Sequence, residues 1–305
     1  MINNNSKYFF HLTDESLGVK RNSRGENFIS LSELKAAYFP NVVNSYSIKL
    51  SLAGTEYYKI NRKEFVVPEM KFLTATSPCE SLGFFESKTI VKGLCVDIDI
   101  NLINQACHIL SPDRTINLDN SFLGYFHSKK FFNNVYSVDS SELGKTLIKL
   151  YSNIISNGFD SSIIDDEFFL QLAELAALHE FENLNRLNSL SSSKLSTKKE
   201  ILKRLLTGKD FIDSNFRNPI DIKQIAAQCC LSEFHFFRSF KEVFGTSPHN
   251  YILKRRLNEA KELLNEQNYS VGEIAHICGF ADIHSFSKSF KKNIGISPTK
   301  FLTKN

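Results

Sequence analysis

The sequence predicts an α+β protein of two domains: a strand-rich N-terminal domain that ends in helices, and an all-α C-terminal domain. Three observations support this prediction. The chain has 305 residues, which is enough for two hydrophobic cores. Apolar residues alternate with polar ones in short runs through residues 28–99, whereas a helical period prevails from residue 198 onward. Between the two patterns lies a segment, 188–197, in which five of ten residues are serine.

The N-terminal domain should begin with several short strands joined by tight turns. From Tyr46 to Leu52 every second residue is apolar, which is typical of a half-buried strand. Gly54 and the polar segment Asn61–Lys63 fit turns between further strands. Strands are expected at 46–52, 55–60, 64–67, 70–76 and 89–97. Short strands at this regular spacing indicate a sandwich or a barrel.

Three helices should follow the strands, at 101–110, 140–156 and 164–190. The last of them has a broad apolar side, made of Phe168, Leu172, Leu175, Leu178 and Phe181. Two interpretations of that side are open at this stage. It packs against the sheet, or it forms a seam between two copies of the chain.

The Ser-rich segment 188–197 has the composition of a flexible linker. It therefore separates an N-terminal domain at residues 1–187 from a C-terminal domain at 198–305. At its end, Thr197 and Glu200 have the spacing of a capping box, in which an N-cap residue and the third helical residue bond each other's backbone. A helix is expected to open the C-terminal domain at this point.

The C-terminal domain contains one pattern twice. Residues 221–251 recur as residues 270–301, about 50 positions later. Matching pairs include Ile225 and Ile274, Ala226 and Ala275, Phe236 and Phe286, and Phe240 and Phe290. A pattern used only twice is too short for a solenoid, which needs about three or more units. Two adjacent helix-turn-helix motifs explain the duplication better.

Each copy should form a short helix, a tight turn and a longer helix. The ranges expected are 221–244 for the first motif, 248–266 for a connecting helix and 270–294 for the second motif. Gly245 and Gly295 suit the left-handed residue that ends a helix, and the Ser-Pro pairs behind them suit the start of the next. About 18 residues of connecting helix span roughly 27 Å, against about 34 Å for one turn of DNA.

The two faces of each longer helix differ in character. Phe236 and Phe240 are four residues apart, as are Phe286 and Phe290, so each pair should face the core. The outward positions are Phe234, Phe237, Arg238 and Lys241 in the first copy, and His284, Ser287, Lys288 and Lys291 in the second. A helix with one face in the core and a polar, basic outer face is typical of major-groove recognition.

This layout resembles the AraC/XylS family of transcription regulators, and the resemblance covers residues 198–305. The second copy carries nearly all of the family signature, notably Ile274-Ala275, Gly279-Phe280, Phe290-Lys291 and Ser297-Pro298. The resemblance implies sequence-specific reading of double-stranded DNA at two adjacent major-groove segments. It assigns base reading to Phe234, Phe237 and Arg238 in the first helix and to Ile283, His284, Ser287 and Lys288 in the second. Lys288 departs from the arginine common in the family, and lysine lacks the rigid fork that reads guanine strictly.

In the N-terminal domain the resemblance is architectural, and it implies a cupin-like β-barrel that binds a small effector. The implied partners are promoter or operator DNA, a small-molecule effector, RNA polymerase if the protein is an activator, and a second copy of the chain. No cofactor is implied. In the main alternative, the N-terminal domain binds no small molecule and responds to a protein partner or to the protein's own abundance.

A more distant alternative is a cupin-type enzyme with a DNA-binding appendage. A metal centre of that kind needs two or more histidines with a carboxylate. None of the eight histidines lies in the predicted strands. The sequence also lacks a Gly-rich phosphate loop and a G-x-S-x-G nucleophile motif. We therefore expect neither a catalytic site nor a metal.

Charge is divided unevenly along the chain. Residues 198–305 contain 18 Lys and Arg against 11 Asp and Glu, a balance of +7, whereas the other 197 residues contain 19 against 22, a balance of −3. A basic C-terminal domain fits a nucleic-acid partner. Apolar runs stay well below the roughly 20 residues of a membrane span, and the first 15 residues do not look like a signal peptide. The expected location is the cytoplasm, with no membrane partner.

The six cysteines have no C-x-x-C spacing and are expected to be free, mostly buried thiols in a reducing compartment. The adjacent Cys229 and Cys230 allow two interpretations: small residues packed at a turn, or a redox sensor.

Three of the base-reading positions are apolar: Phe234, Phe237 and Ile283. On a solvated recognition face such side chains gain little unless they cover something apolar, and in the major groove the target is the thymine 5-methyl group. The operator is therefore expected to be rich in thymine beneath them. In the alternative, Phe234 and Phe237 turn inward and extend the core.

Overall fold

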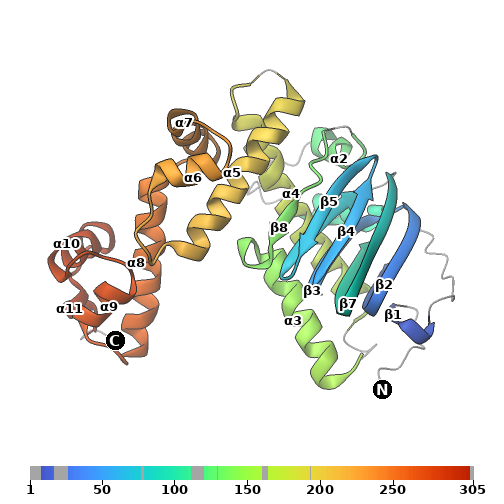
Figure 1. Cartoon of the computed structure of the whole chain (residues 1–305), viewed down its shortest axis with the longest axis horizontal. Coiled ribbons are helices and arrows are strands. Elements are labelled where there is room, and N and C mark those ends of the chain that lie inside the picture. The colour runs from blue at the N-terminus through green and yellow to red at the C-terminus, as the bar shows by residue number, and fades with distance from the viewer. Residues whose placement is uncertain are drawn as a thin grey trace. The chain divides into compact units, whose positions relative to one another are not determined.

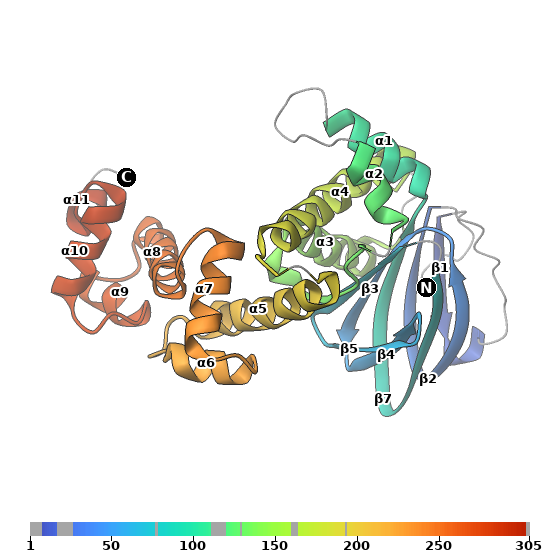
Figure 2. The same cartoon turned by 90° about the horizontal axis from the view of Figure 1, so that it is seen from above.

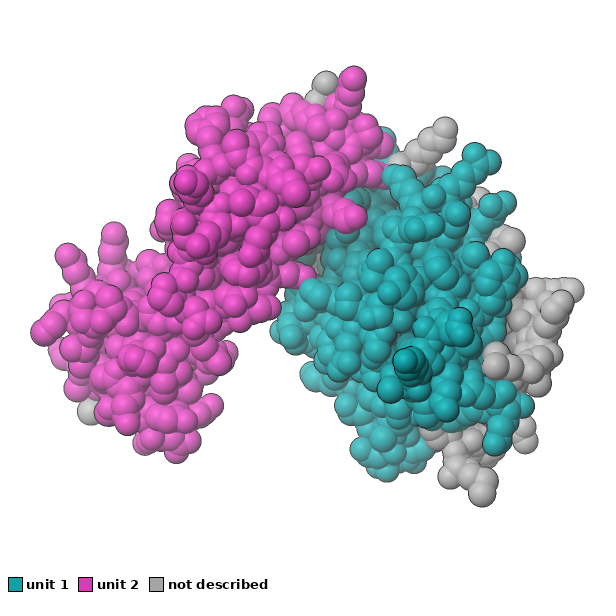
Figure 3. Space-filling model, in the orientation of Figure 1, with its two compact units in different colours: residues 1–185 teal, residues 186–305 magenta. Residues whose placement is uncertain are grey.

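The computed structural model describes residues 8–16, 27–76, 79–110, 120–128, 130–159, 164–192 and 194–302. Residues 1–7, which are part of the 15-residue segment compared with a signal peptide, lie outside this description. The chain divides into two compact units, 1–185 and 186–305, which Figure 3 colours separately. The first unit combines a sheet with helices and the second is helical throughout its described residues, so the protein is α+β (Figure 1).

One sheet dominates the first unit. Its strands are β1 (Phe9–Thr13), β2 (Phe28–Val43), β3 (Tyr46–Ala53), β4 (Thr55–Ile60), β5 (Lys63–Pro68), β6 (Lys71–Thr76), β7 (Cys79–Ile98) and β8 (Val135–Ser137). They are ordered β1-β2-β7-β3-β6-β8, and β4 pairs with both β5 and β7. Only the β1–β2 pairing among these is parallel.

The sheet does not close into a barrel, so the expected cupin-like barrel is not confirmed. β1 and β8 stand at opposite ends of the strand order, and no pairing joins them in the described part of the chain. The long strands β2 and β7 curve instead (Figure 2). β7 pairs with β3 through residues 92–98 and with β4 through residues 81–84, so it links two parts of the sheet. Register shifts at Leu34/Ala36 and Ser51/Ala53 accompany the bend, as β-bulges commonly do.

Both faces of β3 are covered, although its alternating pattern predicted a half-buried strand. Tyr46, Ile48 and Leu50 are fully buried on one face. Ser47 and Lys49 are buried on the other, close to an apolar cluster that includes Leu73. The first face meets helices, since the Tyr46 ring packs edge-on against a helical phenylalanine, Phe126. The strand is therefore fully buried, with a polar side inside the fold.

The helices of the first unit are α1 (Ile100–Leu110), α2 (Asn120–Phe126), α3 (Glu142–Asn157) and α4 (Asp166–Ser189). The buried side of α4 is rotated from the predicted one and includes Phe169, Leu172, Ala173, Ala176, Ala177, Glu180 and Asn183. Small alanines pack there, and Glu180 accepts a hydrogen bond from the Tyr46 hydroxyl at 2.9 Å. The pattern of large apolar residues alone could not identify this side, because it counts neither alanine nor a bonded carboxyl group.

The helices on either side of the Ser-rich segment reach into it. α4 ends at Ser189, and α5 (Leu195–Asn215) begins before Thr197. The predicted capping box at Thr197 is therefore wrong. The Lys198 N–H bonds the Lys194 carbonyl at 3.0 Å, so the first helical turn is already formed around Thr197.

Candidate nucleic-acid interface and an internal polar cluster

The duplicated sequence folds as two helix-turn-helix motifs joined by a rod. The elements are α6 (Ile222–Gln228), α7 (Glu233–Phe244), α8 (Pro248–Glu266), α9 (Val271–Ile277), α10 (Ile283–Ile294) and α11 (Pro298–Leu302). Figure 1 shows α8 running between the α6–α7 pair and the α9–α10 pair. These bounds lie within about one residue of the helices predicted from the sequence.

Local signals fix the ends of these helices. Ser270 opens α9 with a complete capping box, because its side chain and that of Glu273 each bond the other's backbone. Asp221 opens α6 differently, since its carboxylate accepts from the Lys223 N–H at 2.9 Å. α7 and α10 both end at a glycine in the left-handed region, with φ of 67° at Gly245 and 92° at Gly295.

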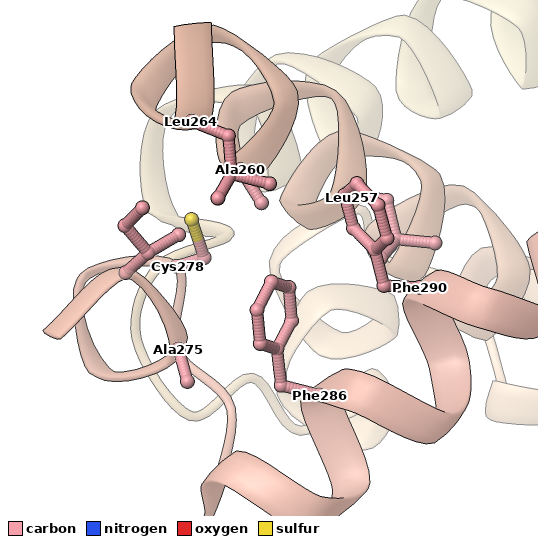
Figure 4. Close-up of a cluster of buried hydrophobic side chains, with 8 residues drawn as sticks. Leu257, Ala260, Leu264, Ala275, Cys278, Phe286 and Phe290 are labelled. Carbon is pink, nitrogen blue, oxygen red and sulfur yellow. The ribbon is translucent and has the colours of Figure 1, made fainter. Parts of the chain in front are cut away.

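Each motif closes around its own phenylalanine pair. In the second, Phe286 and Phe290 of α10 are fully buried with Leu257, Ala260, Leu264, Ile274, Ala275 and Cys278, most of which Figure 4 labels. In the first, Phe236 packs closely on α5: a Cβ on Gly208 would lie only 2.8 Å from the Phe236 ring. α5 is therefore an integral part of the first motif's core.

The rod α8 is anchored by two arginines of the basic run Lys254-Arg255-Arg256. The Arg256 guanidinium donates to the carbonyl oxygens of Phe216 and Asn218, at 2.7 and 2.9 Å. Arg255 forms an ion pair with Asp213 at 2.9 Å. These contacts fix α8 to the C-terminal end of α5 and to the turn that follows. Arg255 and Arg256 thus have structural partners within the second unit.

The outward residues of α7 and α10 are largely exposed. Phe234 is 77 % exposed, Ile283 42 % and Phe237 38 %. This exposure contradicts the alternative in which Phe234 turns into the core, whereas Phe237 is partly covered and lies near the His249 ring. Exposed polar neighbours complete the two faces: Arg238 and Lys241 on α7, and His284, Lys288 and Lys291 on α10, with Ser287 half-buried.

An ion pair lies across the outer face of α7. Arg238 Nε donates to Glu242 Oε1 at 3.1 Å, one helical turn away. Glu242 Oε2 also accepts a long hydrogen bond, 3.5 Å, from the Ser191 hydroxyl. Next to it, the Arg186 guanidinium lies over the Phe244 ring at 5.6 Å from its centre. The chain just before α5 therefore contacts the recognition helix.

The adjacent cysteines at the first turn have different environments. Both are free thiols, Cys229 buried and Cys230 exposed. Burial raises the pKa of Cys229 to about 11, so this thiol stays protonated and weakly nucleophilic near neutral pH. Cys230 occupies the turn with a positive φ of 52°. These features favour packing at a turn over a redox sensor.

The first unit contains a buried polar cluster on the inner side of β3. The Lys49 ammonium lies 3.8 Å from the Cys95 sulfur, and the Cys95 thiol donates to Asp97 Oδ2 at 3.4 Å. Nearby, Glu56 is buried, and its Oε2 has no hydrogen-bond partner among the described residues. Burial raises the pKa of Glu56 to about 7. A Cβ on Gly93 would come 2.5 Å from Glu56 Oε1, so this glycine makes room for the carboxyl group.

The described part of the chain lacks two kinds of feature. No three His, Cys, Asp or Glu side chains gather there in a way that could hold a metal ion. The same residues contain no helix with the length and apolarity to cross a membrane.

Comparison with known proteins identifies relatives that match parts of the chain. A family model described as a helix-turn-helix domain matches residues 225–304. The probable transcriptional regulator LumQ of Photobacterium leiognathi is 32% identical over 92 residues, which are 30% of this chain and 37% of that protein. The uncharacterised HTH-type transcriptional regulator YdiP of Escherichia coli is 29% identical over 163 residues, or 52% of this chain and 51% of that protein.

Solved structures give similar matches. The DNA-binding domain of AdpA, in complex with a target DNA, is 26% identical over 33% of this chain and 91% of that chain, with a TM-score of 0.32. ToxT from Vibrio cholerae, with unsaturated fatty acid bound, is 15% identical over 93% of this chain and 97% of that chain, with a TM-score of 0.35. The matches to curated relatives such as LumQ and GbdR cover less than two thirds of those proteins' length.

Proposed function

Because the C-terminal part of this chain is a helix-turn-helix domain of the AraC/XylS family, we propose that the protein is a transcription regulator that reads two adjacent major-groove segments of DNA. The observation that carries this proposal is the pair of recognition helices with buried phenylalanines on one side and exposed residues on the other. Each outer face combines apolar side chains with cations, which suits thymine methyl groups, base edges and phosphates.

In this proposal α7 reads bases through Phe234, Phe237 and Arg238, with Lys241 on a phosphate. α10 reads through Ile283, His284, Ser287 and Lys288, with Lys291 on a phosphate. The assignment is supported by the exposure of Phe234, Phe237 and Ile283. Exposed apolar side chains on one surface are typical of a binding site, where a partner covers them. The rod α8 has 19 residues, so it spans about 28 Å, close to the rise of one DNA turn.

Selection of randomised double-stranded DNA by the full-length protein tests this function. We expect an enriched site with two elements about one helical turn apart, each containing thymine, and a guanine in the half contacted by α7. Arg238→Ala should weaken binding to this site by about 1–3 kcal/mol in a gel-shift titration. Lys63→Ala removes an equal charge from the exposed first residue of β5 in the first unit and serves as the control. Selected pools without a common sequence would refute the proposal.

We further propose that the first unit regulates the reader through a small polar molecule, bound at the cluster of Lys49, Glu56 and Asp97. The Lys49 ammonium contacts the Cys95 thiol and the Tyr58 ring, and Glu56 Oε2 has no hydrogen-bond partner among the described residues. Buried polar groups of this kind are stabilised by a further group that completes their hydrogen bonds. The curved, open sheet around the cluster suits a cupin-like fold, which we include in this proposal. A homodimer through the first unit, and RNA polymerase as partner of an activator, belong to the same proposal.

Calorimetry with fractionated small-molecule extracts tests the regulatory part. Heat of binding to the full-length protein that disappears in both Lys49→Met and Glu56→Gln would support it. Binding that persists in both variants would move the effector elsewhere. If no fraction binds, the alternative of a ligand-free regulatory unit, responding to a protein or to its own abundance, is favoured.

A further inference from the structure

The two recognition helices differ most in charge. α7 contains two acidic residues, Glu233 and Glu242, and two basic ones, so its formal charge is zero. α10 contains three lysines and no acidic residue, so its formal charge is +3. Because phosphates attract any nearby cation regardless of sequence, α10 alone has the composition for strong sequence-independent binding.

The charge difference is concentrated at one pair of equivalent positions. Glu242 corresponds to Lys292, by the same offset of 50 that relates Phe236 to Phe286. The two helices otherwise have equal length and the same glycine ending. The second motif therefore shows that the fold does not require an acidic residue at this position.

Glu242 is fixed on the protein side of the ion pair. Its side chain is 24 % exposed, whereas that of Arg238 is 61 % exposed. One carboxylate oxygen accepts from Arg238 Nε and the other from the Ser191 hydroxyl. The Glu242 carboxylate therefore occupies the Nε–H donor of the Arg238 guanidinium. This contact uses only Nε, so the two terminal nitrogens of the exposed guanidinium can form the planar fork that binds guanine O6 and N7.

Helix stability does not explain the pair. The order along α7 is arginine first and glutamate four residues later, which is the weaker of the two orientations for stabilising a helix. A carboxylate on a DNA-facing helix also repels phosphates. A role in orienting Arg238 would explain why the Glu242 carboxylate lies beside this exposed arginine.

We propose that Glu242 is a positioning residue that determines specificity: it orients Arg238 toward guanine and cancels the charge of α7, while α10 supplies sequence-independent attraction. This inference rests on the proposed DNA-reading function. In this arrangement Arg238 on α7 reads guanine without added attraction to phosphates, whereas Lys291 and Lys292 strengthen phosphate binding beside the bases read by α10.

The test uses the full-length protein and three DNA duplexes: the selected site, the same site with the guanine under α7 replaced by adenine, and an unrelated sequence. Dissociation constants are measured at several salt concentrations for the wild type, Glu242→Gln, Glu242→Lys and Lys292→Gln. Circular dichroism of each variant verifies folding. Glu242→Gln keeps the shape and an acceptor oxygen while removing the charge, so it separates orientation from charge.

We expect Glu242→Lys to lower the guanine-to-adenine discrimination about ten-fold. It should also tighten binding to the unrelated duplex and steepen the dependence of log K on log salt by roughly 0.9 for each added phosphate contact. Glu242→Gln should retain much of the discrimination. Lys292→Gln should weaken binding to all three duplexes equally, with a shallower salt slope and unchanged discrimination.

Two results would overturn the proposal in distinguishable ways. If Glu242→Lys changed affinity for all three duplexes by one common factor, Glu242 would act only through charge, and the positioning role would be wrong. If the wild type itself did not distinguish the three duplexes, the DNA-reading function would fail, and this inference with it.

Discussion

A methyl group added at Gly279 should destabilise the second helix-turn-helix motif strongly. Gly279 lies at the turn between α9 and α10 with φ of +78°, and an added Cβ would fall 2.1 Å from the Arg217 carbonyl oxygen and 2.7 Å from its carbonyl carbon. Both atoms belong to the backbone, so no side-chain rotation can relieve the overlap. The turn after α5 would have to move away from the second motif.

The first motif separates the two contributions to this cost. Cys230 occupies the equivalent position with φ of 52° and an exposed side chain, so the left-handed conformation itself tolerates a side chain. That conformation costs about 1–2 kcal/mol, and an overpacked contact typically costs about 1–3 kcal/mol more. We therefore expect Gly279→Ala to lower the free energy of unfolding of this motif by about 2–5 kcal/mol.

Hydrogen exchange read by mass spectrometry measures this locally. Peptides from α9 and α10 should exchange faster in Gly279→Ala, while peptides from α1 to α4 serve as internal references. Gly272→Ala is the matched control, because its added Cβ would have nothing nearer than 3.9 Å and lies within α9. It should leave exchange unchanged or slow it slightly. Equal exchange in Gly279→Ala and the wild type would refute the close approach to Arg217.

Four further outcomes are expected. Arg256→Ala leaves two backbone carbonyls without their donor and should destabilise the second unit by about 1–3 kcal/mol in urea titrations. Phe240→Ala should cost about 3–5 kcal/mol of stability, whereas Phe234→Ala should reduce DNA affinity with little change in the urea midpoint. Burial raises the pKa of Glu180 from 4.5 to about 7, so this carboxyl group ionises at a lower pH in the unfolded chain than in the folded one. The free energy of unfolding should therefore fall as pH rises between those two values. Glu180→Gln should flatten that decline in urea titrations from pH 4 to 8. A fragment of residues 186–305 should be helical by circular dichroism and bind DNA with an affinity that falls as salt rises.

The second unit could be predicted closely because its signals are local. Caps, left-handed glycines and the four-residue spacing of phenylalanines act within one or two helical turns, so Ser270 or Gly245 can be interpreted without knowledge of the fold. The outward residues followed from the helical period alone. Duplication added an internal control, because each copy supports the interpretation of the other.

The first unit was harder to predict because its structure depends on distant pairings. The expectation of a strand at 89–97 captured only half of β7, since its earlier part is fixed by pairing with β2 and β4 rather than by alternation. Strands β1, β2 and β8 were not among those expected, and β1 contains His11, although no histidine was expected in a strand. The polar side of β3 was expected to meet solvent, and the curvature that buries Lys49 has no local signature.

Two features of the candidate interface could not be predicted from the sequence. The basic run in α8 gave no indication that Arg256 binds backbone carbonyls, because such acceptors carry no side-chain pattern. The spacing of Arg238 and Glu242 was visible in the sequence. The second contact to Glu242 could not be predicted, because its donor, Ser191, lies 51 residues away along the chain.

The position of the boundary between the units matters for any fusion of the second unit to another domain. It falls between residues 185 and 186, inside α4, and the chain just beyond it contacts α7 through Arg186 over Phe244 and Ser191 on Glu242. A hybrid regulator joined within the Ser-rich stretch would discard Arg186 and could discard Ser191. Fusion upstream of Arg186 would carry the reader together with the residues that brace its first recognition helix, so new sensors are best grafted at that point.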